Sequence, residues 1–260
     1  MKYVKKSLGQ NFLIDKNIIK KIINLVEIKN KDIIEIGPGK GALTEEILKK
    51  KPKSLTVIEK DTVLASELKK NYSNLKNTKV INADILKYNV EKIDNDQTVI
   101  FGNLPYNISS QILVKILKFR KWPPKFSNLI LMFQKELGNK IIGKFLTDDY
   151  GRLSILSNYR LKNINKFSVS PNCFFPKPKV NSMVIHFTPI NRESFKIKKI
   201  ENLEKVTNIL FSNKRKMINK NIKKILNKDK IDKICNLKPN SRPSEIRPEI
   251  YYKITELFEN

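Results

Sequence analysis

The sequence predicts an α/β fold, in which helices cover both faces of a mainly parallel sheet, followed by a small all-helical domain at the C-terminus. Short apolar strands alternate with helical patterns from residue 32 to residue 142, at the spacing of βαβ units. After Pro189 the pattern becomes helical and rich in lysine, without convincing strands. We therefore expect a sheet domain over residues 1–189 and a basic helical domain over residues 190–260.

The expected elements follow one another in a regular order, beginning with a helix over residues 14–28 that Asp15 is placed to cap. The run "DIIEIGPGKGALTEEILKK" then passes from an apolar strand through a glycine-rich turn into a helix. Farther on, "NLILMFQKELGNKII" is typical of a strand that continues into a helix. Two late strands joined by the proline-rich "NCFFPKPKV" predict a hairpin at the sheet edge. The remaining segments are expected as strands at 54–61, 78–84, 98–103, 165–171 and 181–190, and as helices at 62–72 and 109–119.

Four consecutive strands end on residues suited to holding a ligand. Gly37 and Gly39 follow the first strand, Glu59 ends the second, Asp84 the third and Asn103 the fourth. The glycines are spaced G-x-G-x-G, whereas dinucleotide sites use G-x-G-x-x-G, so the turn alone is compatible with a purely structural role. Each of the other residues alone could be a solvated strand end. Together they lie at the edge where open α/β sheets bind ligands, which favours a binding site there.

This set of residues suits a nucleoside without phosphates better than a dinucleotide. A carboxylate such as Glu59 can hold two ribose hydroxyls, and Asp84 could accept from an adenine amino group. The chain has no Walker pair of lysine and hydroxyl residue beside the glycine turn. S-adenosylmethionine combines adenine, ribose and a zwitterionic amino acid. The sequence therefore predicts a Rossmann-like, S-adenosylmethionine-dependent methyltransferase sheet, and we expect no metal.

The stretch "GNLPYN" supplies residues suited to methylating an exocyclic amine, which is a poor nucleophile because its lone pair is delocalised. The Asn103 side-chain oxygen and the Leu104 carbonyl can accept from the amine and align its nitrogen. Pro105 stiffens the turn, and Tyr106 offers a ring on which an extruded base can stack. Asn-Leu-Pro-Tyr resembles the N-P-P-Y motif of amino-group methyltransferases that act on adenine or cytosine.

With further motifs, the chain resembles the bacterial KsgA-type family of small-subunit ribosomal RNA adenine dimethyltransferases. The resemblance covers nearly the whole chain, and the motifs that carry it are "LGQNFL", "IGPGKGALT", "GNLPYNIS", "FQKE", "YGRLSIL" and "FFPKPKVNS". It implies addition of two methyl groups to N6 of each of two adjacent adenosines. These adenosines lie in a hairpin near the 3′ end of the small-subunit (16S) RNA. The implied partner is the small ribosomal subunit, and a link to its biogenesis follows.

The resemblance also assigns roles to individual residues. Asn11 and Leu13 would cover the cofactor, whose pocket the glycine turn, Glu59, Asp84 and Asn103 would complete. Phe174 would form the second aromatic face of a base clamp, opposite Tyr106. The RNA contacts would be made by Arg152, Lys214, Arg215 and Lys216.

Lys214 stands where the family usually has arginine, and lysine lacks the bidentate phosphate geometry of arginine. Two other functions stay open. One is a resistance-type dimethyltransferase acting on large-subunit RNA, although Pro38 and Leu104 replace the serine and isoleucine commoner there. The other is a non-catalytic ribosome assembly or RNA-binding factor that keeps the fold.

Composition agrees with a protein that binds nucleic acid. The 260 residues carry 52 Lys and Arg against 25 Asp and Glu, a net charge of +27. A lysine-rich bias from an A/T-rich genome would give the same signal. The sequence shows no membrane-spanning run and no secretory signal, and Cys173 and Cys235 lack a Cys-x-x-Cys spacing. We therefore expect a cytoplasmic protein without disulfides, and a monomer because no long heptad pattern occurs.

Overall fold

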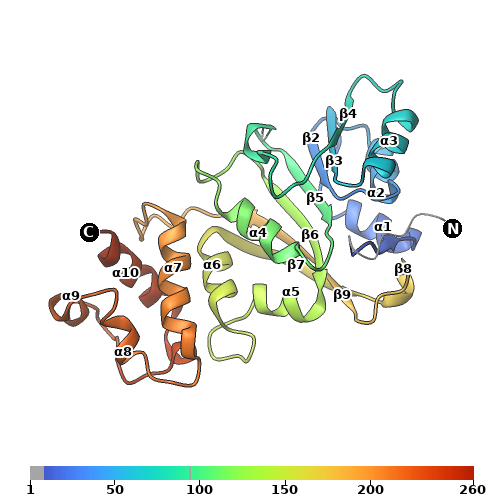
Figure 1. The fold of residues 1–260 in the computed structure, drawn as a ribbon. Coiled ribbons are helices and arrows are strands. Elements are labelled where there is room, and N and C mark those ends of the chain that lie inside the picture. The colour runs from blue at the N-terminus through green and yellow to red at the C-terminus, as the bar shows by residue number, and fades with distance from the viewer. Residues whose placement is uncertain (1–8, 94) are drawn as a thin grey trace. The chain divides into compact units, whose positions relative to one another are not determined.

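The computed structural model describes residues 9–93 and 95–260, which form two compact units (Figure 1). The sheet unit contains the described residues up to Gly138 together with Lys162–Pro189. The helical unit contains Asn139–Leu161 together with Ile190–Asn260. The second stretch of the sheet unit ends at Pro189, and the expected domains 1–189 and 190–260 stay a prediction. The sequence predicts that residues 139–161 belong to the sheet domain, whereas this division places them in the helical unit.

The sheet has seven strands in the order β4-β3-β2-β5-β6-β9-β7. The five strands from β4 to β6 are parallel, whereas β9 is antiparallel to β6 and β7 lies outside it at the edge. The two strands expected to form a hairpin are therefore neighbours at this edge. The strand bounds are Asp32–Ile36 (β2), Ser54–Glu59 (β3), Thr78–Asn82 (β4), Val99–Asn103 (β5), Asn128–Gln134 (β6), Leu161–Val169 (β7) and Ser182–Pro189 (β9).

Helices connect the parallel strands as the sequence predicts. The first is shorter than expected, but Asp15 caps it by accepting from the backbone N–H groups of Asn17 and Ile18. The chain runs from β2 outward to β4 and then returns to β5 on the other side of β2. Because such crossovers are right-handed, the reversal puts helices on both faces of the sheet. Their bounds are Lys16–Ile23 (α1), Ala42–Lys49 (α2), Thr62–Asn71 (α3), Ser109–Leu117 (α4) and Lys135–Ile141 (α5).

One large apolar cluster of the sheet unit lies between the strands and the first two helices. Alternate strand residues such as Leu55, Val57 and Phe101 are buried in the same apolar cluster as Ile22 of α1 and Ile47 of α2. The sole histidine, His186, is a strand residue whose ring bonds to the Asn128 side chain at 2.7 Å. A separate two-stranded sheet joins β1 (Phe12–Leu13) to β8 (Phe174–Phe175).

The helical unit is held together by tyrosines that bind across long sequence distances. Tyr150 donates to the carbonyl of Ile246 at 2.8 Å, and Tyr252 donates to the carbonyl of Ile155 at 3.2 Å. These bonds explain why residues 139–161 pack with the tail. The helices are Arg152–Arg160 (α6), Ile200–Leu210 (α7), Asn219–Ile222 (α8), Lys228–Asp232 (α9) and Pro248–Glu259 (α10), and 3₁₀ turns occur at Val90–Ile93, Pro171–Cys173, Phe211–Asn213 and Pro243–Glu245.

Within residues 9–93 and 95–260, we find no helix with the length and apolar character that crossing a membrane requires.

Candidate active site

A cleft opens in the sheet unit at the carboxyl ends of the parallel strands. It lies beside the switch point between β2 and β5, where the strand order changes direction. It holds about 920 Å³ of empty space, including its open mouth. Its walls come from the segment before α1, the turn after β2, the ends of β3 and β4, and the residues that follow β5. They are Gly9, Gln10, Asn11, Phe12, Ile36, Gly37, Gly39, Ile58, Glu59, Lys60, Leu64, Ala83, Ile85, Asn103, Leu104, Pro105, Tyr106, Asn107, Ile108 and Ile112.

The glycine turn needs glycine at both predicted positions. Gly37 and Gly39 have φ values of +69° and +58°, in the left-handed region that side chains disfavour. A Cβ atom on Gly37 would lie 3.2 Å from the backbone oxygen of Asn103. One on Gly39 would lie 2.8 Å from the ring of Phe12. The turn is therefore a bare stretch of backbone that a ligand can approach closely.

Glu59 lies in the cleft wall and organises the backbone around it. One carboxylate oxygen accepts from the N–H of Gly39 at 3.1 Å, and the other accepts from the N–H of Asp61 at 2.8 Å. The side chain is almost fully buried, and this burial raises its pKa. Gln10 contacts the residue that donates to Glu59, because its side-chain amide donates to the Asp61 carboxylate at 3.0 Å. The predicted ribose-binding acid thus also ties the glycine turn to β3.

Asp84 lies at the rim of the cleft, and its expected contact with adenine stays a prediction. Its neighbours Ala83 and Ile85 line the cleft, but Asp84 itself is not among the lining residues. Its carboxylate forms an ion pair with Lys60 at 2.9 Å and accepts from the N–H of Leu86 at 2.9 Å. The Lys60 ammonium is the main reason that the pKa of Asp84 is lowered. In this structure the carboxylate is engaged with the protein at the rim.

The four residues from Asn103 to Tyr106 all line the cleft, as predicted. Asn103 ends β5, and its side-chain N–H donates to the carbonyl of Asn11 at 3.3 Å. The segment before α1 is thereby joined to the end of β5. Tyr106 is half-buried, and burial raises its pKa, so the phenol stays protonated at neutral pH. Its hydroxyl shares a hydrogen bond of 2.5 Å with the hydroxyl of Ser182 on β9.

Two residues assigned by resemblance lie in the core, whereas Asn11 lines the cleft. Leu13 and Phe174 are each 3% exposed, and they pair with each other across the β1–β8 ladder. Both belong to the main apolar cluster of the sheet unit, and neither lines the cleft. The contacts of Phe174 therefore do not support its expected role as one face of a base clamp, which stays a prediction.

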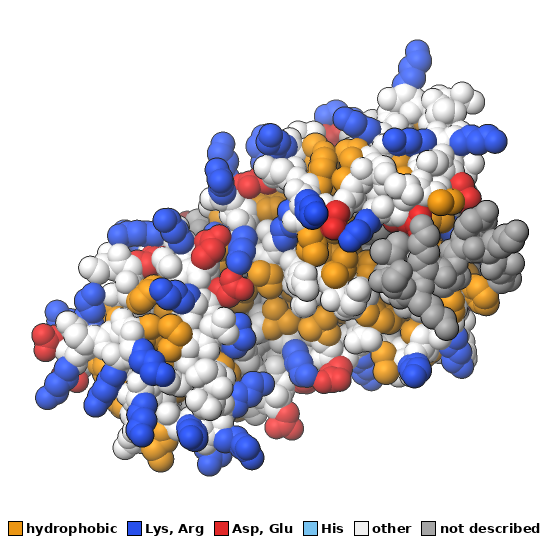
Figure 2. All heavy atoms as spheres, viewed as in Figure 1, with side chains coloured by type: hydrophobic (Ala, Val, Ile, Leu, Met, Phe, Trp, Pro, Cys, Tyr) orange, Lys and Arg blue, Asp and Glu red, His pale blue; other side chains and the backbone are white. Residues whose placement is uncertain are grey.

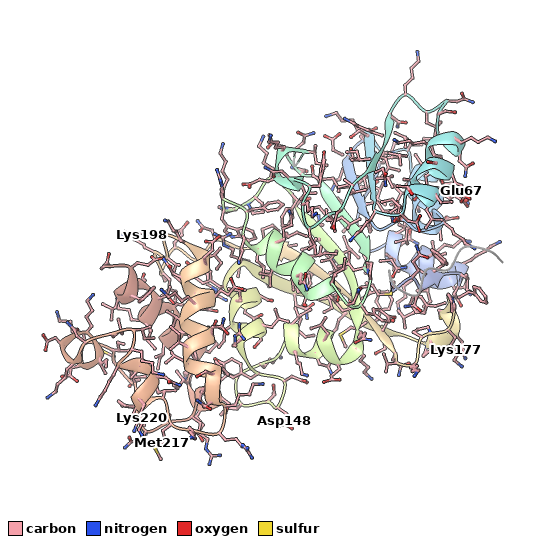
Figure 3. The ribbon with its side chains drawn as sticks, in the orientation of Figure 1. Glu67, Asp148, Lys177, Lys198, Met217 and Lys220 are labelled. Carbon is pink, nitrogen blue, oxygen red and sulfur yellow. The ribbon has the colours of Figure 1, made fainter. Side chains whose placement is uncertain are left out.

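The predicted RNA-contact residues are all in the helical unit. Arg152 is exposed in the first turn of α6, and Lys214, Arg215 and Lys216 are exposed in the segment between α7 and α8. Met217 and Lys220, next to this segment, point outward from the helical unit in Figure 3. The basic run therefore offers its charges to solvent.

Sequence reasoning missed several residues that shape the cleft. Gln10, Phe12 and Ser182 lie within motifs that carry the resemblance, but nothing in the sequence indicates which side chains they contact. Lys60 follows Glu59 directly, and only its ion pair with Asp84 reveals its position. In the described part of the chain, no group of three or more His, Cys, Asp or Glu side chains is arranged to hold a metal ion.

Comparisons with known proteins place the chain among enzymes that act on ribosomal RNA. The sequence model of the family described as ribosomal RNA adenine dimethylase matches residues 1–260. The chain is 44% identical over 260 residues to ribosomal RNA small subunit methyltransferase A of Pelagibacter ubique, covering 98% of this chain and 97% of that protein. It is 41% identical to the protein of the same name from Malacoplasma penetrans, covering 97% of this chain and 91% of that protein.

Solved structures show the same fold. A dimethyladenosine transferase from Plasmodium falciparum matches with a TM-score of 0.75 and 26% identity, over 94% of this chain and 95% of that one. The 23S rRNA methyltransferase ErmE matches with a TM-score of 0.68 over 96% of this chain and all of that one. Its 24% identity supports the shared fold alone.

Proposed function

The chain belongs to the ribosomal RNA adenine dimethylase family, and from this premise we propose that it dimethylates N6 of two adjacent adenosines in a hairpin near the 3′ end of small-subunit RNA. It is an S-adenosylmethionine-dependent enzyme of ribosomal RNA methylation. The observation that carries the proposal is the placement of Asn103, Leu104, Pro105 and Tyr106 in the cleft at the sheet edge. The full-length likeness to small-subunit enzymes favours this target over large-subunit RNA.

The cleft fits the cofactor in both shape and chemistry. The glycine turn contributes bare backbone to the cleft, because Gly37 and Gly39 both line it and carry no side chain. Glu59 supplies a carboxylate for ribose hydroxyls, and apolar residues such as Ile85 and Ile58 can enclose a purine. Asn11 and Gln10 would cover the bound molecule from the segment before α1.

The residues after β5 would hold the target adenine. The Asn103 side-chain oxygen and the Leu104 carbonyl accept from the N6 amine, which holds its nitrogen in line for attack and stabilises the charge that develops there. Tyr106 stacks on the extruded base. When bound, the cofactor supplies a methyl group, which the N6 lone pair accepts while the sulfur keeps the electron pair of the broken C–S bond. The methylated nitrogen then loses a proton to water, so no strong general base is required.

The helical unit would contact the RNA around the target. Its residues 190–260 carry 18 Lys and Arg against nine Asp and Glu, a net charge of +9. Arg152, Lys214, Arg215 and Lys216 are our proposed phosphate contacts, since all four are exposed. We take the partner to be the small ribosomal subunit and the protein to act as a monomer.

The test is to incubate undermodified small subunits with S-adenosylmethionine and to determine methylated nucleotides by mass analysis of digested RNA. We expect two neighbouring N6,N6-dimethyladenosines near the 3′ end. Asn103→Ala should lower the rate by about 100-fold or more, since it removes an aligning acceptor at the reacting nitrogen. Asn74→Ala, at an exposed position of the sheet unit, is the matched control and should keep normal activity.

Two outcomes would overturn the proposal. Methylation of large-subunit RNA alone would favour the resistance-type function. Tight binding of small subunits by the unmutated protein, without any methyl transfer, would favour the non-catalytic assembly factor.

A further inference from the structure

Tyr106 is anchored at both of its ends by buried serines. The hydroxyl of Ser109, at the start of α4, donates to the Tyr106 backbone carbonyl at 3.2 Å. The hydroxyl of Ser182, at the start of β9, shares the 2.5 Å bond with the Tyr106 phenol. Both serines are 0% exposed. A tyrosine fixed at its backbone and at its ring tip has no freedom to change rotamer without breaking one of these bonds.

The position of Ser182 is itself set by the sheet. Ser182 lies opposite Gln134 in the antiparallel pairing of β9 with β6. Next to this pair, the N–H of Lys135 donates to the carbonyl of Asn181 at 2.9 Å. The serine hydroxyl therefore projects from a rigid ladder. It gives Tyr106 a fixed point at the sheet edge, although the residues that precede and follow Tyr106 lie in a loop.

We propose that Ser182 is a positioning residue for methyl transfer, because it holds the Tyr106 ring in the orientation in which the target adenine stacks. This inference rests on the function proposed above. Ser182 contacts neither the adenine nor the cofactor in this proposal, and it moves no proton. Its contribution is to hold the Tyr106 ring in place before the base enters. Binding of the base then requires no further loss of side-chain conformational entropy at Tyr106.

A double-mutant cycle tests this inference, with methyl transfer to undermodified small subunits as the assay. Ser182→Ala removes one partner of the bond and Tyr106→Phe removes the other, while both variants keep the aromatic ring. We expect each to lower kcat by about 5- to 10-fold, the scale of one lost hydrogen bond. The Ser182→Ala/Tyr106→Phe double variant should be no slower than either single variant, because all three lack the same bond. Cofactor affinity, measured by calorimetry, should stay within about twofold of normal in all three.

Ser157→Ala is the matched control. Ser157 is a buried serine of α6 whose hydroxyl has no hydrogen-bond partner among the described residues, so its loss tests the effect of removing a buried hydroxyl as such. Its kcat should be normal. A merely structural role of Ser182 would lower thermal stability without making the effects of the two substitutions on kcat non-additive.

Several outcomes would overturn the inference. One is a Ser182→Ala enzyme that turns over as fast as Ser157→Ala, and another is a double variant whose loss is the product of the two single losses. If Ser182→Ala does not fold, Tyr106→Phe decides alone, and a normal kcat in that variant refutes the inference. Absence of methyl transfer by the unmutated protein would instead refute the proposed function, and the inference with it.

Discussion

Among single residues, Glu35 is a buried acid outside the cleft whose protonation affects the stability of the fold. It lies on β2 just before the glycine turn and is 1% exposed. The hydroxyl of Thr44 donates to its carboxylate at 2.6 Å. Burial and, to a smaller extent, the nearby Glu59 carboxylate raise the pKa of Glu35 to about 7, against the lowering effect of the Thr44 bond. The folded protein thus binds a proton that the unfolded chain releases near its ordinary pKa.

This difference predicts how stability depends on pH. Because the folded-state pKa is raised, the contribution of Glu35 is most favourable in acid and is lost as the pH rises toward about 7. Glu35→Gln should remove this dependence. The free energy of unfolding of the variant, relative to the unmutated protein, should rise by about 2.5 kcal/mol between about pH 5 and about pH 8. Urea denaturation at the two pH values measures it.

Glu67→Gln is the control, since Glu67 is exposed on α3 and points to solvent (Figure 3). Its stability relative to the unmutated protein should not change across that interval. A Glu35→Gln variant that behaves in the same way would show that Glu35 is ionised in the folded state throughout.

Among the elements, the turn from β2 to α2 places its backbone directly beside the end of β5. Gly37→Ala would force a side chain into the left-handed region, with its Cβ 3.2 Å from the Asn103 backbone oxygen. Backbone cannot give way as a flexible side chain does. We expect a loss of about 1–2 kcal/mol in the free energy of unfolding, together with slower methyl transfer as Asn103 shifts.

Gly151→Ala provides the comparison. Gly151 has an extended backbone with φ 177°, and the nearest atom to an added Cβ is 3.9 Å away. Its substitution should change stability by less than about 0.5 kcal/mol. Equal losses in the two variants, measured by denaturation, would contradict a special requirement for glycine at position 37.

The elements themselves were largely predictable from the sequence, because each parallel strand and its helix are marked by local patterns. The cleft was predictable to the same extent, since strand ends converge at one edge and therefore bring Glu59 near Asn103. What the sequence does not contain is the partner of each side chain. Tyr106 and Ser182 lie 76 positions apart, and Tyr150 and Ile246 lie 96 apart. The ion pair of Asp84 and the burial of Phe174 likewise depend on packing that no local pattern encodes.

At the scale of the whole molecule, the high positive charge is widely spread. Figure 2 shows lysine and arginine side chains over elements of both units on the visible face. Net charge alone would therefore attract RNA without selecting a contact surface. The exposed run Lys214, Arg215 and Lys216 is where we expect direct phosphate contacts.

Salt dependence can separate direct contacts from general attraction. Replacing Lys214, Arg215 and Lys216 by alanine should reduce the slope of log affinity against log salt by about 2 to 3, because each direct phosphate contact adds about 0.7 to 0.9 to it. Replacing the exposed Lys69, Lys70 and Lys76 of the sheet unit removes the same charge and should change the slope much less. Equal changes in binding assays over a salt series would mean that net charge, not this run, determines affinity.

The helical unit is built from two separated stretches, and this has a consequence for how a new chain matures during synthesis. Ile155 leaves the ribosome 97 positions before Tyr252, whose hydroxyl donates to its carbonyl. At ordinary elongation rates that interval lasts about 5 to 20 seconds. Throughout it, α6 lacks its bond to Tyr252, although β9, which lies between β6 and β7 in the sheet, is made before Tyr252. α10 therefore completes the helical unit described here, and a chain cut short before Pro248 would lack the helix that carries Tyr252.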